Sequence, residues 1–340
     1  MKKRILYIGN FIASSTQYVT ASDILCDLLK KEGYLVVKTS DKLNKILRLW
    51  DMLWTMTKTK NQTDLILIDT FSTDNFYFAF LCSQWARILK LTYINILHGG
   101  NLPDRLIQNP FLSQLIFKNA KILVAPSNYL KDVFERHGYL VKMIPNIIPI
   151  ENYSYKERQQ IQPKLLWVRA FDQIYNPVMA IEVLKLVSQK YPRAELCMVG
   201  PTKDQSFDNT IQLVNKYGLA PHVKFTGVLS KSVWHQIAEQ YDIFINTTNI
   251  DNTPVSVIEA MALGLTIIST NVGGIPYLIE HEKEGVLVHK NDAEAMAAAI
   301  YQLIENPFIA IEMTQKARKK VEQMDWNVVK YQWNKVLNDV

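Results

Sequence analysis

Cysteine is scarce in this 340-residue sequence, and the three that occur, Cys26, Cys82 and Cys197, are far apart and lie in apolar stretches. This pattern is typical of buried free thiols rather than of a disulfide framework, and it favours a reducing, cytoplasmic environment. No stretch approaches the ~18 consecutive apolar residues that a membrane-spanning helix needs. Residues 1–8 resemble the charged start of a signal peptide, but Gly9 and the residue after it interrupt the apolar run, which predicts a first strand instead. Any membrane contact is therefore expected to be peripheral.

The composition lacks the bias of disordered or fibrous chains, with 48% hydrophobic and 21% charged residues. The length exceeds one ordinary core, so we expect two domains. Residues 1–150 carry 19 Lys and Arg against 11 Asp and Glu, whereas residues 151–340 carry 19 against 21. The basic N-terminal half could face a phosphate-bearing substrate, anionic lipid or nucleic acid, or it could be a solvated surface without a partner. Nucleic acid is the weakest of these, because the basic residues form neither an aromatic-studded stripe nor a known module.

Short β-rich runs alternate with amphipathic helical patterns twice along the chain, which predicts an α/β protein with two doubly wound parallel sheets. We expect an N-terminal domain at 1–150, a linker at 151–163, a C-terminal domain at 164–324, and a last helix at 325–340 that packs back on the N-terminal domain. Ligands of such sheets bind at the carboxyl ends of the strands, so a central cleft between the domains is expected. The predicted strands are 4–8, 34–38, 65–69, 92–97, 121–125, 141–144, 165–169, 195–199, 223–226, 243–246, 266–270 and 285–288.

The clearest local signal is a helix start, with Thr253 as N-cap and Pro254 as the first helical residue. Gly264 is placed to end this helix after about three turns. Asp251 precedes the helix and Glu259 lies a turn and a half inside it, so two carboxylates bracket its N-terminus. Unpaired amides and the positive end of the helix dipole suit a diphosphate, and carboxylates accept hydrogen bonds from hydroxyls. A nucleotide sugar has this layout, although two acids at this spacing are by themselves more often structural.

A longer pattern surrounds this helix and covers essentially the whole second half of the chain. It comprises Asp251-Asn252-Thr253-Pro254, Glu259-Ala260-Met261-Ala262, Gly264, Val272-Gly273-Gly274-Ile275-Pro276, Phe225-Thr226-Gly227-Val228, Met198-Val199-Gly200-Pro201 and Asp325-Trp326-Asn327. This pattern closely resembles glycosyltransferase family 4, whose members have the GT-B fold of two Rossmann-like domains. The resemblance implies a retaining, metal-independent enzyme without a cofactor, which moves a hexose-type sugar from a UDP-, GDP- or other nucleotide-diphosphate sugar. The acceptor would be a glycan, a lipid-linked or a small molecule, as in bacterial surface polysaccharide or glycoconjugate synthesis.

The resemblance also implies roles for individual residues of the donor-binding C-terminal domain. Asp251 would bond the hydroxyls of the transferred sugar, Glu259 would take the ribose, and Arg169 would contact the diphosphate with its bidentate guanidinium. Here the chain departs from the family in two ways, since Asp251 stands where Glu is usual and the lysine about five residues after Arg169 is missing. Lys203 is a candidate for the compensating charge. The remaining predicted donor-binding residues are Val255 and Ser256, through their backbone amides, and Asn252, Gly200 and Val228.

In the N-terminal, acceptor-side domain, Leu97-His98-Gly99-Gly100 follows the fourth predicted strand, and glycines there allow the backbone to approach a ligand closely. His98 resembles the family residue that contacts the sugar across the cleft, and with Asp251 and Arg169 it forms the predicted catalytic set. The first loop keeps Gly9, but Ser14 and Ser15 stand where relatives carry a glycine pair. Their hydroxyls would bond phosphate or acceptor, or else cap the following helix. Gly9, Ser14, Ser15, Gly99 and Gly100 therefore form a candidate acceptor or phosphate loop set.

One further segment, residues 42–60, carries apolar side chains at helical spacing with lysine and arginine between them. They are Leu43, Ile46, Leu47, Trp50, Leu53 and Trp54. We expect a helix packed on the first sheet, because amphipathic core helices are the common case. The alternative is a helix that lies on an anionic membrane, which would place the protein on the inner face of the cytoplasmic membrane and favour a lipid-linked acceptor.

Two other classes of function use the same architecture. A nucleotide-sugar epimerase or a glycosyl phosphorylase would be a different enzyme on this fold. A degenerate homologue would bind the sugar nucleotide without turning it over, and the missing lysine and altered first loop favour it. Loss of activity in Asp251→Ala and Glu259→Ala would separate an enzyme from a binding module.

Overall fold

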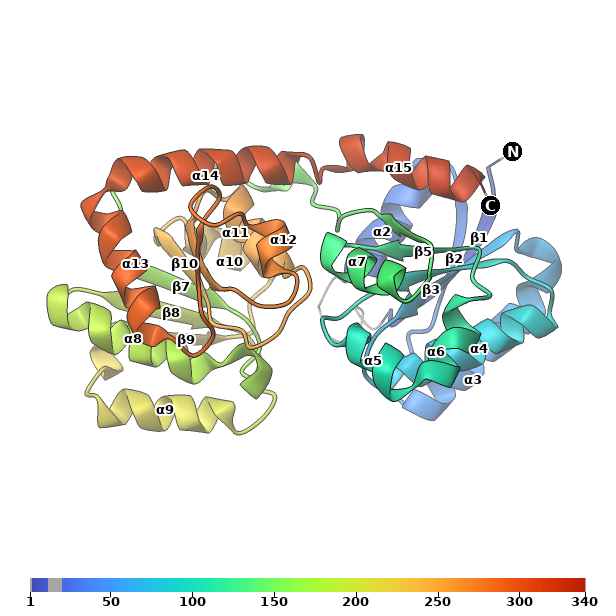
Figure 1. Cartoon of the computed structure of the whole chain (residues 1–340), viewed down its shortest axis with the longest axis horizontal. Helices are drawn as coiled ribbons and strands as arrows, with labels where there is room; N and C mark the ends of the chain where they lie inside the picture. The colour runs from blue at the N-terminus through green and yellow to red at the C-terminus, as the bar shows by residue number, and fades with distance from the viewer. Residues whose placement is uncertain (1, 12–19, 340) are drawn as a thin grey trace. The chain divides into compact units, whose positions relative to one another are not determined.

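The computed structural model describes residues 2–11 and 20–339, and it divides into two compact units. Unit 1 comprises Met1–Ile147 and Trp326–Val340, and unit 2 comprises Ile148–Asp325. Each unit contains one parallel six-stranded sheet with helices packed against it (Figure 1). The predicted GT-B class with two Rossmann-like sheets is confirmed.

In unit 1 the strand order is β2-β1-β3-β4-β5-β6, so the order reverses between β1 and β3. The strands are β1 (Arg4–Ile8), β2 (Leu35–Thr39), β3 (Leu65–Thr70), β4 (Tyr93–Leu97), β5 (Ile122–Ala125) and β6 (Val141–Met143). The helices are α2 (Ala21–Lys31), α3 (Lys45–Thr59), α4 (Asn75–Ile88), α5 (Leu102–Gln108), α6 (Pro110–Phe117), α7 (Asn128–Arg136) and α15 (Trp326–Asn338).

Successive strand residues of this sheet point to opposite faces, and both faces are buried. Ile5 and Tyr7 of β1 pack with α2 and α15, whereas Leu6 and Ile8 pack with α3 and α4. The central strands therefore read as continuous apolar runs, which is why the sequence reveals them.

In unit 2 the strand order is β12-β11-β10-β7-β8-β9, and the order reverses between β7 and β10. The strands are β7 (Lys164–Val168), β8 (Glu195–Val199), β9 (Val223–Gly227), β10 (Ile243–Asn246), β11 (Thr266–Thr270) and β12 (Val286–Val288). The helices are α8 (Pro177–Lys190), α9 (Ser206–Lys216), α10 (Lys231–Ala238), α11 (Val255–Ala262), α12 (Ile275–Leu278), α13 (Ala293–Glu305) and α14 (Pro307–Glu322). All twelve predicted strands occur, with boundaries within one residue of those expected.

The segment 151–163, which we predicted as the linker, packs as part of unit 2. Tyr153, Arg158 and Ile161 are each at most 5% exposed. Arg158 donates to Asp242 Oδ1 at 3.0 Å and to the carbonyl of Gly264 at 2.7 Å. The segment has no apolar periodicity, so nothing in the sequence indicated that these three side chains are buried in unit 2.

The last helix, α15, belongs to unit 1 and packs on the same sheet face as α2. Val329, Trp333 and Leu337 lie in its core cluster. Tyr34 donates from its hydroxyl to Asn334 Oδ1 at 2.8 Å, which fixes the helix further. The three cysteines are all buried and unpaired, as predicted.

The apolar face of α3 is placed differently from our expectation. Arg48, Met52 and Met56 are its buried residues, and Arg48 donates to the carbonyls of Lys42 and Leu43. Because this basic residue finds backbone acceptors in the segment just before the helix, it can be buried, and the opposite face turns outward. The residues that we expected against the sheet are exposed, except for the half-buried Leu53: Leu43, Ile46, Leu47, Trp50 and Trp54.

Candidate functional site

In unit 2 the candidate site begins where the strand order reverses, at the carboxyl ends of β7 and β10. Arg169 follows β7 directly, and Asp251 lies in the loop between β10 and α11. Arg169 Nη2 donates to Asp251 Oδ2 in an ion pair, and the side chains are 14% and 15% exposed. The other oxygen of Asp251 accepts from the backbone N–H of Asn252 at 2.8 Å. The two residues that the resemblance assigned to different parts of a donor are therefore in direct contact.

Arg169 retains binding capacity beyond this ion pair. Its guanidinium lies over the ring of Tyr175 at 4.6 Å, a cation–π contact that holds the plane of the group. Its Nε is enclosed and has no hydrogen-bond partner among the described residues. Buried donors are almost always paired in native proteins, so an unpaired one indicates a missing acceptor. An anionic oxygen would supply it.

Two sets of glycines hold this arrangement by permitting close backbone contact. A Cβ at Gly200, one residue past β8, would lie 1.8 Å from the carbonyl oxygen of Arg169. A Cβ at Gly273 would lie 2.1 Å from the carbonyl oxygen of Asp251, and one at Gly274 would lie 1.9 Å from that of Asn252. The amide of Gly274 also donates to the Asp251 carbonyl at 2.9 Å. These glycines therefore support the backbones of Arg169 and Asp251, which is a role that the sequence pattern alone did not assign.

The start of α11 differs from the prediction by one residue. Pro254, not Thr253, is the N-cap, and its carbonyl accepts from the amides of Val257 and Ile258. Pro254 is extended, and its ring offers no capping oxygen, so the first amides of α11 stay available. The helix has eight residues, about two turns rather than three, and the residue at its C′ position, Gly264, has φ +77° as expected.

Ser256 adds a second unpaired polar atom at this helix end. Its Oγ is buried and has no partner among the described residues. Val255 is 38% exposed, so the first turn of α11 is not sealed by protein. The predicted anion site thus consists of backbone amides, one orphan hydroxyl and the guanidinium at the same strand switch.

Glu259 is the most enclosed of the predicted acids, with a side chain that is 5% exposed. Its Oε1 accepts from the Tyr153 hydroxyl at 2.8 Å and from Lys231 Nζ at 2.7 Å. Burial and the neighbouring Glu259 charge raise the pKa of Tyr153 well above its usual value, so the phenol remains a donor. Both contacts end on Oε1, and Oε2 accepts none of the hydrogen bonds among the described residues. That oxygen is available for a ligand hydroxyl.

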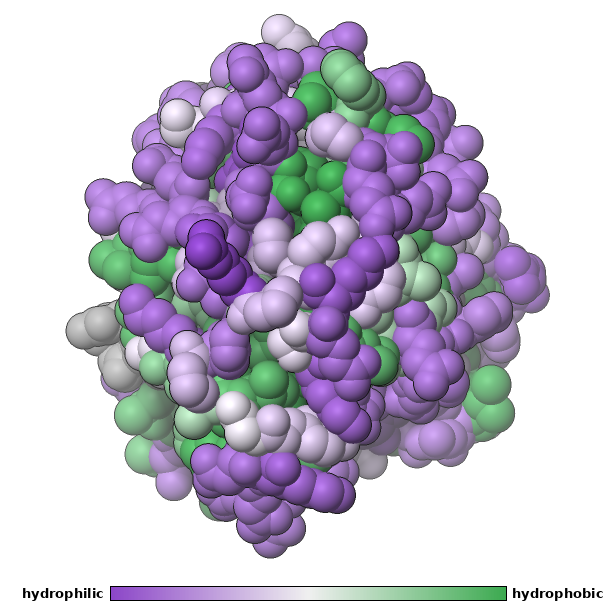
Figure 2. Space-filling model, turned by 90° about the vertical axis from the view of Figure 1, so that its left-hand side faces the viewer, coloured by the Kyte–Doolittle hydropathy of each residue, from purple (hydrophilic) through white to green (hydrophobic). Residues whose placement is uncertain are grey.

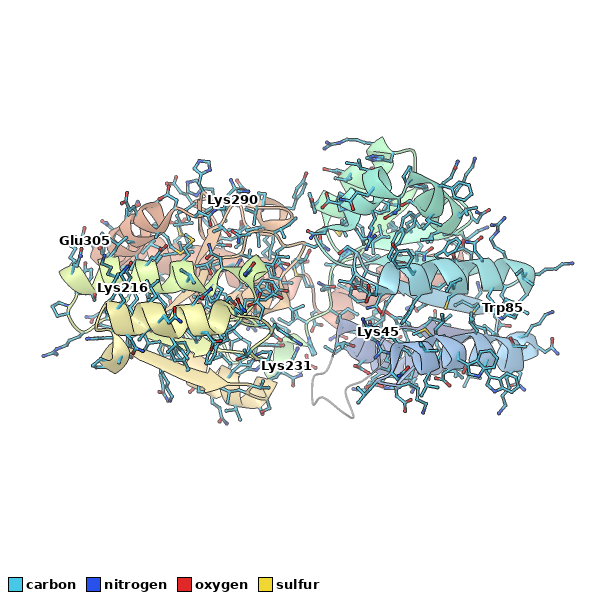
Figure 3. The ribbon with its side chains drawn as sticks, turned by 90° about the horizontal axis from the view of Figure 1, so that it is seen from below. Lys45, Trp85, Lys216, Lys231, Lys290 and Glu305 are labelled. Carbon is cyan, nitrogen blue, oxygen red and sulfur yellow. The ribbon has the colours of Figure 1, made fainter. Side chains whose placement is uncertain are left out.

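The lysine of this site is therefore Lys231, at the start of α10, which the sequence analysis missed (Figure 3). Lys203, the earlier candidate, is exposed and makes no ion pair within residues 2–11 and 20–339. Val228, predicted as donor-binding, is 50% exposed just after β9. The ends of β8 and β9 are joined by a hydrogen bond, since the Gly200 amide donates to the Gly227 carbonyl at 2.9 Å.

In unit 1 the predicted residue His98 is held by an acid that sequence reasoning did not single out. His98 Nε2 lies 2.9 Å from Asp69 Oδ1, which also accepts from the Tyr7 hydroxyl at 2.9 Å. The other oxygen, Asp69 Oδ2, accepts from the Ser22 hydroxyl at 2.6 Å. The Asp69 side chain is 2% exposed, and the Phe71 ring stacks on His98 at 4.8 Å. A carboxylate at Nε2 requires the proton on that nitrogen, so Nδ1 of the neutral ring is an acceptor.

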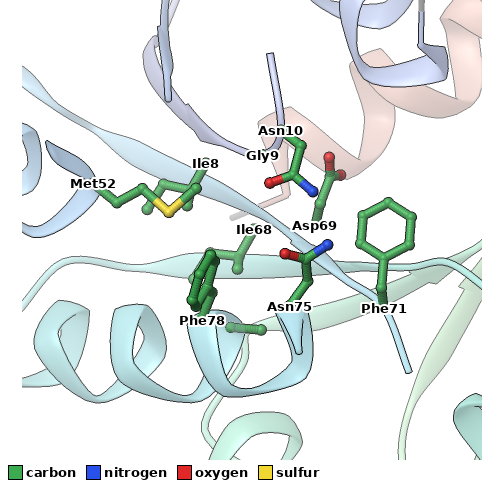
Figure 4. A pocket seen from close by; sticks show the side chains of 10 residues that line it. Ile8, Gly9, Asn10, Met52, Ile68, Asp69, Phe71, Asn75 and Phe78 are labelled. Carbon is green, nitrogen blue, oxygen red and sulfur yellow. The ribbon is translucent and has the colours of Figure 1, made fainter. Parts of the chain in front are cut away.

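A small pocket lies beside this group at the carboxyl ends of β1 and β3. Figure 4 shows the Asn10, Asp69, Phe71 and Asn75 side chains around it. Gly9 also lines it, and a Cβ there would lie 2.5 Å from Asp69 Oδ2, so glycine is required by the close approach of that acid. The volume of about 10 Å³ admits roughly one water molecule. This pocket alone does not hold a sugar.

The rest of the predicted first-half set is only partly described. Gly99 has φ +88°, and the Gly100 carbonyl accepts from the Tyr129 hydroxyl at 3.4 Å. Ser14 and Ser15 lie outside the described residues. The predicted catalytic residues thus fall into two groups, Arg169 with Asp251 in unit 2 and His98 in unit 1.

Residues 152–324 match the family described as glycosyl transferases group 1, which is just over half of the chain and nearly all of unit 2. The chain belongs to this family. Alignments with known proteins also extend beyond residues 152–324. The amylovoran biosynthesis glycosyltransferase AmsK of Erwinia amylovora is 28% identical over 255 residues, covering 69% of this chain and 61% of that protein. The N-acetyl-alpha-D-glucosaminyl L-malate synthase of Bacillus anthracis is 26% identical, covering 76% and 72%.

Solved structures that resemble this group 1 glycosyl transferase agree with it in fold. HepE of Anabaena in complex with UDP and glucose aligns with TM-score 0.78 and 17% identity, covering 99% of this chain and 100% of that one. Sucrose-phosphate synthase of Thermosynechococcus elongatus aligns with TM-score 0.81 and 16% identity, covering 99% of each. The chain spans 30% to 61% of the length of the first three curated relatives it matches.

Three residues of this family member carry contacts that the sequence analysis missed: Asp69, Tyr153 and Lys231. Asp69 left a usable signal, because an acid at the carboxyl end of an otherwise apolar buried strand is unusual. Tyr153 and Lys231 left none, since they lie 106 and 28 residues from Glu259. In the described part of the chain, no three His, Cys, Asp or Glu side chains form a group that could hold a metal ion.

Proposed function

We propose that this chain is a retaining glycosyltransferase that moves a hexose-type sugar from a nucleotide-diphosphate sugar to a glycan or lipid-linked acceptor. The observation that carries the proposal is the cluster of unsatisfied groups at one strand switch of unit 2. Arg169 Nε and Ser256 Oγ are buried donors without acceptors among the described residues, and Ser256 belongs to the open first turn of α11. Glu259 Oε2 and the Asp251 carboxylate supply acceptors for hydroxyls. A diphosphate with a ribose on one side and a sugar on the other satisfies all of them.

The proposed binding mode follows from the charges. The diphosphate would accept from the amides of Val255 and Ser256 and from Arg169, while Glu259 would accept from the ribose. Asp251 would accept from hydroxyls of the transferred sugar, with its ion pair to Arg169 linking the sugar and phosphate contacts. Lys231 would orient Glu259 through the 2.7 Å contact to its Oε1. Asn252 is 5% exposed. Asn252 and Gly200 would therefore act indirectly, by supporting the backbone of the donor site.

In the proposed reaction, the bond between the anomeric carbon and the diphosphate oxygen breaks, and the acceptor hydroxyl oxygen bonds to the same face of that carbon. The hydroxyl proton passes to the departing diphosphate, so charge and atoms balance without an added cofactor. The chain contributes positioning and stabilisation of the developing negative charge. Arg169 and the α11 amides stabilise the leaving group. His98 Nδ1 would accept a hydrogen bond from a sugar hydroxyl, as the family resemblance implies. Metal independence and retention remain expectations drawn from the family resemblance.

The wider role is inferred from relatives. AmsK is named for amylovoran biosynthesis, and WcaL of Escherichia coli, 33% identical over 124 residues, is named a putative colanic acid biosynthesis glycosyltransferase. Both relatives are thus named for the biosynthesis of a bacterial polysaccharide. We therefore propose that this chain acts in surface polysaccharide or glycoconjugate synthesis.

Nucleotide specificity can be tested first by thermal denaturation with UDP, GDP and other nucleoside diphosphates and their sugars. A bound nucleotide at 100 times its Kd raises the unfolding free energy by about 2.7 kcal/mol. Turnover of the stabilising sugar nucleotide is then measured in the native chain, Asp251→Ala, Glu259→Ala and the control Asp208→Ala, an exposed acid of α9. We expect loss of activity in the first two variants and full activity in the control.

The same assay tests the mechanism and the alternatives. Activity should persist in EDTA, and the anomeric configuration of the product, read by proton NMR, should equal that of the donor. Loss in EDTA that magnesium restores would contradict metal independence. Stabilisation by UDP without any turnover would indicate a binding module, and release of an epimerised sugar nucleotide would indicate an epimerase.

A further inference from the structure

The outer face of α3 is an apolar stripe with no protein partner among the described residues. Ile46 is 79% exposed, Trp50 66% and Trp54 58%. At about 100° per residue, these side chains fall with Leu47 inside an arc of roughly 100°, on the side of the helix opposite Met52. By contrast, the unit 2 face in Figure 2 shows small apolar patches separated by hydrophilic side chains.

An aromatic residue of the neighbouring helix borders the stripe. Trp85 of α4 donates its ring N–H to Thr57 Oγ1 at 3.0 Å, and Thr57 falls within the same arc of α3. At the other end of α3, Lys45 Nζ lies 2.5 Å from Asp74 Oδ2, just before α4. These two contacts show that the helices run in the same direction, and Figure 3 shows them side by side. The indole of Trp85 is thus held beside the stripe rather than free to cover it.

Basic side chains flank the stripe on both sides. Lys58 borders one edge, and Lys60, the C-cap residue of α3 with αR backbone angles, falls near the other. Lys58 and Lys60 make no ion pair within the described residues. Segment 41–60 carries five Lys and Arg against two Asp, and unit 1 as a whole carries 21 basic against 12 acidic residues, a net charge of +9. Unit 2 carries 17 against 20, a net charge of −3. The apolar stripe therefore lies on the strongly cationic unit.

This combination fits one class of partner better than others. Lysine is depleted in protein–protein interfaces, and charged side chains are excluded from their centres. A helix with Trp and Leu on one face and lysine at its borders instead matches the boundary between lipid headgroups and acyl chains, where indoles are half immersed and lysine stems extend to phosphate. Within the described residues, no helix is both long enough and apolar enough to cross a membrane.

We propose that α3 docks unit 1 onto an anionic bilayer surface. Trp50, Trp54 and Ile46 enter the headgroup boundary, and Lys58 and Lys60 contact lipid phosphates and carboxylates. This surface lies on a different unit from the Arg169–Asp251 site, so the proposal does not depend on the proposed function.

The test is sedimentation of the full chain with phosphatidylcholine vesicles, with and without about one third phosphatidylglycerol. The native chain should bind the anionic vesicles, and more weakly at high salt. Trp50→Ser/Trp54→Ser should lower the partition coefficient by at least about tenfold, and Lys58→Gln/Lys60→Gln should lower it on anionic vesicles only. The matched control is Phe308→Ser/Ile309→Ser on α14, whose residues are 84% and 40% exposed, and it should bind like the native chain.

Thermal denaturation midpoints within about a degree of the native value would show that the variants are folded, as expected for exposed positions. The proposal is overturned if the native chain does not sediment with anionic vesicles. It is also overturned if the double tryptophan variant binds as well as the native chain. A third contrary outcome is a dimer in lipid-free solution that this variant abolishes, because the stripe would then be a self-interface.

Discussion

Two glycines of unit 2 form a matched pair that tests how the Asp251 loop is held. Gly273 has φ +54° and Gly218 has φ +66°, so both occupy the left-handed region. A Cβ at Gly273 would lie 2.1 Å from the Asp251 carbonyl oxygen, whereas a Cβ at Gly218 meets nothing within 4 Å. Gly273→Ala and Gly218→Ala therefore share the conformational cost and differ in the steric one.

The magnitudes can be separated. A left-handed alanine costs about 1–2 kcal/mol at either position. At Gly273 the added carbon meets backbone, which cannot rotate away, and overpacking of this kind costs about 1–3 kcal/mol more. The shift would also break the 2.9 Å hydrogen bond from the Gly274 amide to Asp251, for about 1 kcal/mol. We expect a loss of unfolding free energy of roughly 3–6 kcal/mol for Gly273→Ala and about 1–2 kcal/mol for Gly218→Ala.

The assays are thermal denaturation and UDP binding by calorimetry. For a unit of this size, each kcal/mol lowers Tm by about 2–4 °C, so the two variants should be clearly separated. The displaced loop leads directly into α11, and UDP affinity should therefore fall more than about tenfold in Gly273→Ala and stay within about twofold in Gly218→Ala. Equal UDP affinities in the two variants would refute the argument that this close contact positions the site.

Three further predictions concern the buried polar groups. Asp69→Asn removes the charge that orients His98, and steady-state kinetics should show kcat reduced by about tenfold or more with the donor KM little changed; a change confined to KM would contradict a positioning role. Lys231→Met leaves Glu259 buried without its cation, and urea titration should show a loss of about 1–3 kcal/mol in unfolding free energy, whereas the exposed Lys224→Met should not. Burial lowers the pKa of His235 below its ordinary value of 6.5, so the unfolded chain binds more protons as the pH falls below that value. Stability should then decline by at most about 1.4 kcal/mol per pH unit, and Tm measured between pH 7.5 and 5.5 should show a flatter profile in His235→Asn; identical profiles would rule out this histidine as the cause.

Much of the fold was predictable because its signals are local. Strands buried on both faces must be apolar along their whole length, and Ile5 to Ile8 in β1 or Leu65 to Ile68 in β3 leave little alternative. Asp251 and Glu259 could be placed at one helix end because Pro254 starts that helix and Gly264 ends it. The sequence by itself therefore determined the order of elements, the two doubly wound sheets and the group of residues around α11.

Tertiary structure decided which side chains meet. Asp69 and His98 are 29 residues apart, and Arg169 and Asp251 are 82 apart, so their pairing depends on strand order and not on spacing. The orientation of α3 was equally undetermined, because it has two apolar faces at the same helical period. In the folded protein the face with Met52 and Met56, whose side chains are narrower than an indole, packs in the core. The face with Trp50 and Trp54 is exposed. Periodicity can show that a face is apolar, but only the shape and hydrogen bonds of the surface beneath decide which face is buried.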